Sequence, residues 1–289
     1  MTENKTHDIL NIIKNVYEKN EFGKITEWKA MEPSVISKIM GTIFKPVSWL
    51  IQTVIPESTM RGAIQVSNNA SKFLIDNEKF KKECNIREIA ELKKRPLNEC
   101  DDFANEIHNW AVGYAATEGG VTGATGIIGM AVDIPAIITL AFRTINKIGL
   151  CYGYENKSEE DNQIILSILS AAGANTMKEK QLALLTLKQL EIIVLKTTWK
   201  KMAQKATENE LTKEAGIIAL KNLAKQLGIN LTKRKALQVV PIIGAAVGAS
   251  VNGVFINDIA WAARRVFQER WIIEKYKEEL VYDDYINID

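Results

Sequence analysis

The chain has 289 residues, of which 46% are hydrophobic and 25% are charged, and its formal net charge is +2. This composition excludes extensive disorder, and the near-zero net charge gives no electrostatic reason to expect a nucleic-acid partner. Cys84, Cys100 and Cys151 form no CxxC pair, so neither a disulfide framework nor a thiolate metal site is indicated. The polar N-terminus lacks the apolar core of a signal peptide, and we expect a cytoplasmic protein.

Apolar residues at helical spacing begin in the N-terminal third of the chain. Residues 36–54 follow the three-and-four rule of an amphipathic helix, which Pro46 should kink or divide and Pro56 should end. A further helix is expected over residues 63–74. The strongly charged stretch 76–97 favours short helices or loops.

The middle of the chain carries two helix predictions. Residues 101–117 should form a helix whose first two residues, both aspartates, lie where the helix dipole favours negative charge. Asp133 followed by Pro135 is typical of a helix start, with the aspartate as the cap. That helix should continue to about Cys151 and stop before Gly153.

Capping signals predict the later helices. Ser158 with Asp161, and Thr176 with Glu179, resemble capping boxes, which satisfy backbone amides at a helix start. Helices are therefore predicted over residues 159–172 and 177–206. A further helix is expected over 210–227, ended by Gly228, and an amphipathic segment over 258–279. No alternating pattern long enough for a sheet is present.

Two long stretches are almost free of charge. Residues 119–142 contain Asp133 as their one charged residue, and residues 236–257 contain none. Small residues at regular spacing let helices approach closely, so six glycines are expected at helix contacts: Gly120, Gly123, Gly126, Gly129, Gly244 and Gly248. The stretches fit either two buried core helices or a hairpin that dips into a bilayer. A central aspartate costs about 2.5–3.5 kcal/mol on insertion, which argues against simple spanning.

No catalytic motif is present. The chain lacks HExxH, GxSxG and a P-loop, so we expect no metal site, no cofactor and no assigned catalytic residue. A loose set of acidic residues and one histidine is interpreted as a solvated helix face: Asp101, Asp102, Glu106, His108 and Glu118.

A second set of polar residues borders the uncharged stretches. Charges in apolar surroundings need partners, and clusters of this kind can be functional sites. The set is Glu118, Asp133, Arg143, Asn252, Asp258, Arg265 and Glu269. It fits either surface ion pairs with a helix cap at Asp133, or a buried cluster between the two glycine-rich helices.

Two spaced signatures resemble those of the EcsC family over roughly residues 46–275. The first comprises residues 115–123 (AATEGGVTG), Asp133-Ile134-Pro135, Arg143 and Tyr152-Gly153-Tyr154. The second comprises residues 240–248 (VPIIGAAVG), Asn252, Asn257-Asp258 and Phe267. Glu155 departs mildly from the aspartate expected at its position. The resemblance implies a helical bacterial protein linked to membrane processes such as ABC transport, and implies no reaction.

These observations predict one all-α domain with the two glycine-rich apolar helices packed at its centre. Residues 1–45 are expected as an N-terminal helical extension, 46–275 as the EcsC-like region and 276–289 as an acidic tail. The function we expect is non-enzymatic and accessory to a membrane process at the inner face of the membrane, with a membrane lipid or membrane protein as partner. The alternatives are a hydrolase of lipid or peptide using Glu118, Asp133 and His108, and a soluble interaction module.

Overall fold

The computed structural model describes residues 9–33, 64–66, 75–124, 126–174, 176–203, 241–277 and 279, and describes side chains in these ranges outside 118–135, 191–203 and 241–251. Within these ranges the chain is helical and contains no strand, as predicted. The main elements are α2 (Val16–Ala30), α5 (Asn77–Glu83), η3 (Ile89–Lys94), α6 (Leu97–Ala124), α7 (Gly126–Cys151), α8 (Glu159–Ala172), α9 (Met177–Ala203) and α11 (Pro241–Lys275). The helices predicted over 36–54 and 210–227, and most of that over 63–74, lie outside the described residues.

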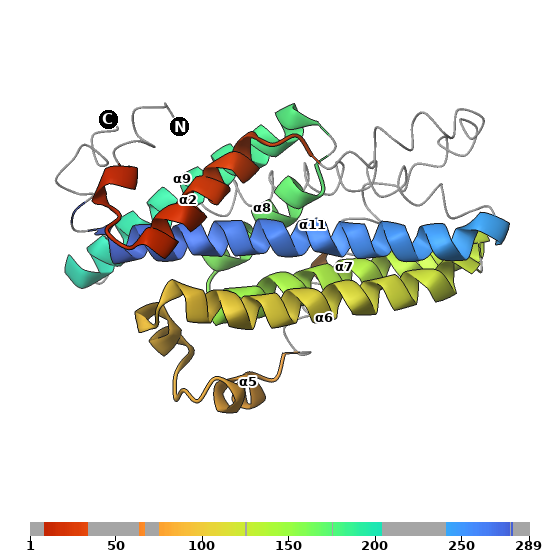
Figure 1. Cartoon of the computed structure of the whole chain (residues 1–289), viewed down its shortest axis with the longest axis horizontal. Coiled ribbons are helices and arrows are strands. Elements are labelled where there is room, and N and C mark those ends of the chain that lie inside the picture. Colours follow the sequence, from red (N-terminus) through yellow and green to blue (C-terminus); the bar gives the residue numbers. More distant parts are fainter. Residues whose placement is uncertain are drawn as a thin grey trace.

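Three long helices, α6, α7 and α11, form the centre of the molecule (Figure 1). α6 and α7 are an antiparallel hairpin, and α11 packs against both of them. α11 runs antiparallel to α6, because Gly253 lies against Ala116 near one end and Gln268 bonds to Asp101 near the other. α2 and α8 pack on α11, and α9 packs on α8.

Small side chains let α6 and α11 lie close together. Ala104, Ala111 and Ala115 on α6 are fully buried, at spacings of one and two helical turns. A Cβ built on Gly253 of α11 would lie 3.5 Å from the Cβ of Ala116. The close contact of two helices through small residues is thus present in the described part of the bundle.

Local signals predicted several helix ends correctly. α8 begins after the complete capping box of Ser158 and Asp161 and spans the predicted residues. The Thr176 hydroxyl accepts a hydrogen bond from the Glu179 amide at the start of α9. α7 ends at Cys151, as predicted, because Gly153 has a φ of +83° that a helix cannot contain.

Two predicted helix starts were wrong. α7 begins at Gly126, so Asp133 lies inside the helix and is not its cap. Pro135 removes one backbone donor, but packing of α7 against α6 and α11 outweighs this local preference. α6 begins at Leu97, after Pro96, which places Asp101 in the second turn instead of the first. The apolar stretch and the amphipathic segment that follows it are continuous in α11.

Gly153 provides a test of the chain reversal after α7. A Cβ there would lie 2.9 Å from the backbone nitrogen of Lys93, in addition to the strain of the positive φ. We expect Gly153→Ala to lower the free energy of unfolding by about 2–4 kcal/mol. Gly23→Ala on α2 is the control, since its Cβ would meet nothing within 4 Å, and it should be neutral or stabilising. Equal effects of the two substitutions in denaturant titrations would contradict the expectation.

Candidate functional site

The carboxylate of Asp101 is the centre of a buried polar network. Its Oδ1 accepts hydrogen bonds from the Tyr152 hydroxyl at 2.5 Å and from Nε2 of Gln268 at 2.6 Å. Its Oδ2 accepts from the Tyr17 hydroxyl at 2.7 Å. Asp101 is 3% exposed, so its charge needs these donors. One side chain on α6 therefore connects α2, the segment after α7, and α11.

The network continues from Gln268 to a buried ion pair. Nη1 of Arg265 donates to Oε1 of Gln268 at 2.8 Å and to Oε2 of Glu21 at 2.7 Å. Lys24 adds a second cation 2.6 Å from Glu21. We call Tyr17, Glu21, Asp101, Tyr152, Arg265 and Gln268 the Asp101 cluster.

Burial and partners shift the two carboxyl groups in opposite directions. Burial raises the pKa of Asp101 above its ordinary value, although hydrogen bonds from Tyr152, Tyr17 and Gln268 favour the ionised form. Burial alone would also raise the pKa of Glu21, but hydrogen bonds from Lys24 and Arg265 outweigh it and lower that pKa. The tyrosine hydroxyls beside Asp101 have raised pKa values, through burial and the adjacent carboxylate, and remain protonated donors.

Two further ion pairs join α2 to the C-terminal part of α11. Glu18 accepts from Lys275 at 2.6 Å and from the Tyr276 hydroxyl at 2.8 Å. Lys29 lies 2.5 Å from Glu269. Three ion pairs, counting Glu21–Arg265, thus join these helices, and α2 also contributes Phe22 to the core.

The predicted set on α6 divides between the core and the surface. His108 is buried: its Nε2 hydrogen-bonds with Oδ1 of Asn257 at 3.0 Å, and its ring meets Trp261 edge-on. Burial lowers its pKa, which favours the neutral ring. Asp102 and Glu106 are exposed, as predicted, but the prediction of a solvated face was wrong for Asp101 and His108. The described residues contain no group of three potential ligands that could hold a metal ion.

The second predicted set does not gather at one place among its described members. Arg265 and Glu269 both face α2, where each has an ion-pair partner. The Arg143 guanidinium lies over the Trp110 ring of α6 at 4.8 Å. Asn252 is buried and Asp258 is half-buried. The side chains of Glu118 and Asp133 lie outside the described side chains.

The six glycines predicted at helix contacts all lie near the same end of the bundle. Gly120 and Gly123 are in the last turns of α6, Gly126 and Gly129 in the first turns of α7, and Gly244 and Gly248 in the first turns of α11. Figure 1 shows these three helix ends together. What each glycine contacts is not described, so their role in packing stays a prediction.

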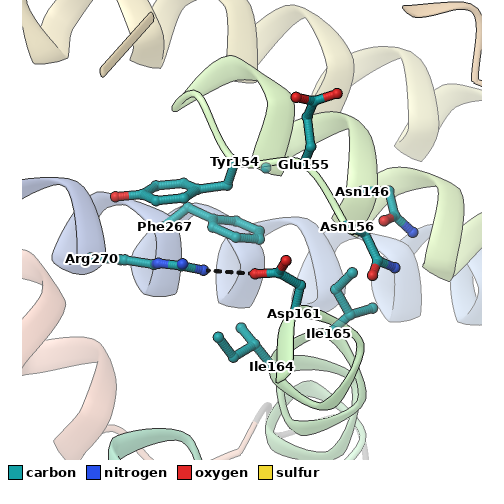
Figure 2. A pocket seen from close by; sticks show the side chains of 10 residues that line it. Asn146, Tyr154, Glu155, Asn156, Asp161, Ile164, Ile165, Phe267 and Arg270 are labelled. Carbon is teal, nitrogen blue, oxygen red and sulfur yellow. Dashed lines mark ion pairs between the residues drawn. The ribbon is translucent and has the colours of Figure 1, made fainter. Parts of the chain in front are cut away.

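A small pocket lies between α8 and α11 (Figure 2). Arg270 lies 3.6 Å from Asp161 and 4.2 Å above the ring of Tyr154, which stacks on Phe267. The volume of about 10 Å³ suits one water molecule and is far below that of a metabolite site. The Asn156 carboxamide lines the pocket, and both of its polar atoms are buried without a protein partner, so a water is the occupant that fits.

Comparison with known proteins identifies the family of the chain. The sequence model of the EcsC protein family matches residues 19–272. The chain belongs to the EcsC family. The match begins within α2 and so includes Glu21, whereas the resemblance in the sequence begins near residue 46.

An EcsC-family relative and the structural comparison add little about activity. The chain is 23% identical over 248 residues to "Uncharacterized protein YdbA" of Bacillus subtilis (strain 168), covering 86% of this chain and 82% of that protein. No solved structure matches. Among the described residues, no helix combines the length and apolar content that crossing a bilayer requires.

The Glu21–Arg265 pair should stabilise the fold only as a pair. The two side chains are 7% and 10% exposed, so removing one partner leaves a buried charge. We expect Glu21→Leu or Arg265→Met to lower the free energy of unfolding by about 3–5 kcal/mol, and the double variant to lose less than the sum. The exposed pair Lys79–Glu83 is the control, where the same changes should cost less than about 0.5 kcal/mol. Strict additivity at Glu21 and Arg265 would contradict the expectation.

The two carboxyl groups should show opposite pH dependence. The pKa of Asp101 is raised in the folded protein. Its contribution to the free energy of unfolding is therefore fully present below its ordinary pKa and is lost as pH rises through the folded value. Because the folded pKa of Glu21 is lowered, its contribution is present above its ordinary pKa and is lost as pH falls through the folded value. Asp101→Asn should therefore cost more near pH 3 than near pH 7, and Glu21→Gln the reverse. Denaturant titrations of the wild type and of both variants between pH 3 and pH 7 measure these costs. If both costs change with pH in the same way, the expectation is contradicted.

Proposed function

We propose that this EcsC-family protein is a non-catalytic, membrane-associated accessory protein that inserts one end of its helical bundle into the inner face of a membrane. The inserted part consists of residues 119–124 of α6, 126–132 of α7 and 241–252 of α11, which we call the uncharged end. Its association with lipid would leave the opposite end of the molecule outside the bilayer, where it would assist a membrane process such as ABC transport.

One observation carries this proposal: three uncharged segments, far apart in the sequence, come together at one end of one bundle (Figure 1). The α2–α11 ion pairs and the Asp101 cluster lie at the other end. A soluble bundle has no need to separate its charge in this way, since polar residues normally cover all of its surface. A bilayer favours it, because charged side chains are expensive in hydrocarbon.

Two carboxylates set a limit on insertion. Asp133 and Glu118 lie about 10 Å from the turn between α6 and α7, at about 1.5 Å per residue. A charge at hydrocarbon depth costs several kcal/mol. Shallow and reversible insertion of a helical hairpin therefore fits this protein better than spanning.

The test is binding of the full chain to phosphatidylcholine vesicles, measured by co-sedimentation. Ile128→Asp and Ile242→Asp place a new charge in the uncharged end, and each should weaken binding by about tenfold or more. Asp133→Asn removes the charge that borders the uncharged end on α7 and should strengthen binding. The matched controls are Leu182→Asp and Leu185→Asp on α9, whose side chains are 60% exposed, and binding should not change.

Circular dichroism melting of each variant separates lost binding from lost folding. If the folded variants at Ile128 and Ile242 bind as well as the α9 controls, the uncharged end is not the inserted part. If the wild-type chain stays in the supernatant at every concentration of phosphatidylcholine vesicles, insertion through the uncharged end is refuted.

A further inference from the structure

Two exposed aromatic side chains lie on α6 between the Asp101 cluster and the uncharged end. Trp110 and Tyr114 are 47% and 46% exposed and stack at 5.3 Å, one helical turn apart. Exposed stacked aromatics are unusual on a soluble surface but typical of the bilayer interface, where the rings lie among lipid headgroups.

One cation of α7 lies against this aromatic pair, and a second follows it along the helix. The Arg143 guanidinium is over the Trp110 ring at 4.8 Å, and Lys147 follows one turn later on the same helix. Within the described chain neither side chain forms an ion pair, and the buried Nε of Arg143 has no hydrogen-bond partner. Residues 141–151 are otherwise buried, so Arg143 and Lys147 are the side chains of this segment that remain partly accessible.

The two cations also repel each other. Burial lowers the pKa of Lys147 first, and the positive charge of Arg143 lowers it further. The charge of Glu83 opposes this shift, but its described ion pair is with Lys79. Two cations placed together without an ion pair are unfavourable unless an anion binds between or above them. Arg143 and Lys147 together therefore carry the positive charge that a phosphate-binding site requires.

Trp110 and Arg143 lie on the water side of the two carboxylates that limit insertion. Trp110 lies about 21 Å and Arg143 about 25 Å from the α6–α7 turn, and Glu118 and Asp133 lie about 10 Å from it, at about 1.5 Å per residue. With both carboxylates held at the edge of the hydrocarbon, a bundle tilted toward the bilayer surface brings Trp110 and Arg143 to the headgroups, and the long Lys147 side chain reaches them from about one turn farther along α7.

We infer that Trp110, Tyr114, Arg143 and Lys147, the aromatic–basic face, bind the phosphate of an anionic phospholipid in the leaflet that the uncharged end enters. This rests on the proposed function and names the lipid class. Arg143 and Lys147 would contact the phosphate, and Trp110 and Tyr114 would lie at the level of the glycerol backbone.

The experiment compares full-chain binding to phosphatidylcholine vesicles with binding to vesicles containing about one third phosphatidylglycerol. The wild type should prefer the anionic vesicles. Each interfacial charge contributes about fivefold, so Arg143→Gln with Lys147→Gln should reduce that preference roughly 30-fold. The control is Lys178→Gln with Lys188→Gln on α9, which removes the same net charge and should have little effect. Arg143→Lys keeps the charge and should keep most of the preference, which guards against a folding defect.

The outcomes separate the two proposals. Equal binding of wild type to both vesicle types, or equal loss in the α9 control, overturns the phosphate site and leaves insertion of the uncharged end standing. Undiminished binding of Ile128→Asp to both vesicle types, together with a preference for anionic vesicles that the Arg143 and Lys147 changes abolish, supports the phosphate site and overturns insertion. Binding of inorganic phosphate to this face, detected by Trp fluorescence titration, with no vesicle binding would assign the site to a soluble anion and overturn the lipid.

Discussion

The fold depends on a single buried acceptor, the carboxylate of Asp101. Three donors converge on its two oxygens, and their residues are 84, 51 and 167 positions away in the sequence. A buried charge left without donors would cost several kcal/mol, so the position of α6 is linked to those of α2, of the segment after α7 and of α11. Arg265 and Glu21 extend the same network. At this end of the bundle the helices are therefore held together by polar contacts as well as by apolar packing.

This constraint also explains why charge is distributed unevenly along the bundle. The buried ion pairs occur where α2 crosses α11, and there the helices can be held at a fixed distance by charged side chains. Toward the other end, Ala116 of α6 lies against Gly253 of α11, and small residues of this kind allow two helices to approach closely. The same helices thus have a polar, anchored end and an uncharged end.

Local sequence patterns predicted a helix end correctly where the residues at that end determine it. Ser158 with Asp161 begins α8 and Gly153 ends α7, because capping and positive φ are properties of a few adjacent residues. Asp133 with Pro135 has an equally good local pattern for a helix start, but tertiary packing continues α7 through it.

The candidate site was harder to predict than the fold. Asp101 looked like a first-turn aspartate because its partners, among them Tyr17 and Gln268, are distant in the sequence. α2 was expected as an extension of the domain, although its Glu18 and Glu21 are buried against α11. Arg265 and Glu269 were identified as unusual from their spacing, but spacing along one helix cannot show that their partners are on α2. Long-range pairing of this kind needs the three-dimensional structure.

The chemistry of the uncharged end determines how the protein would associate with lipid. Glycine and alanine expose little apolar area, and each Å² removed from water contributes only about 25 cal/mol. The carboxylates of Glu118 and Asp133 oppose insertion further. Insertion through this end alone would therefore be weak and reversible, and stable attachment to membranes generally needs a second signal such as a basic patch. Arg143, which lies over the Trp110 ring, and Lys147 have the charge that such a second signal requires. Neither contribution is large by itself, so the protein would bind anionic membranes, where both act, more tightly than neutral membranes, where insertion acts alone.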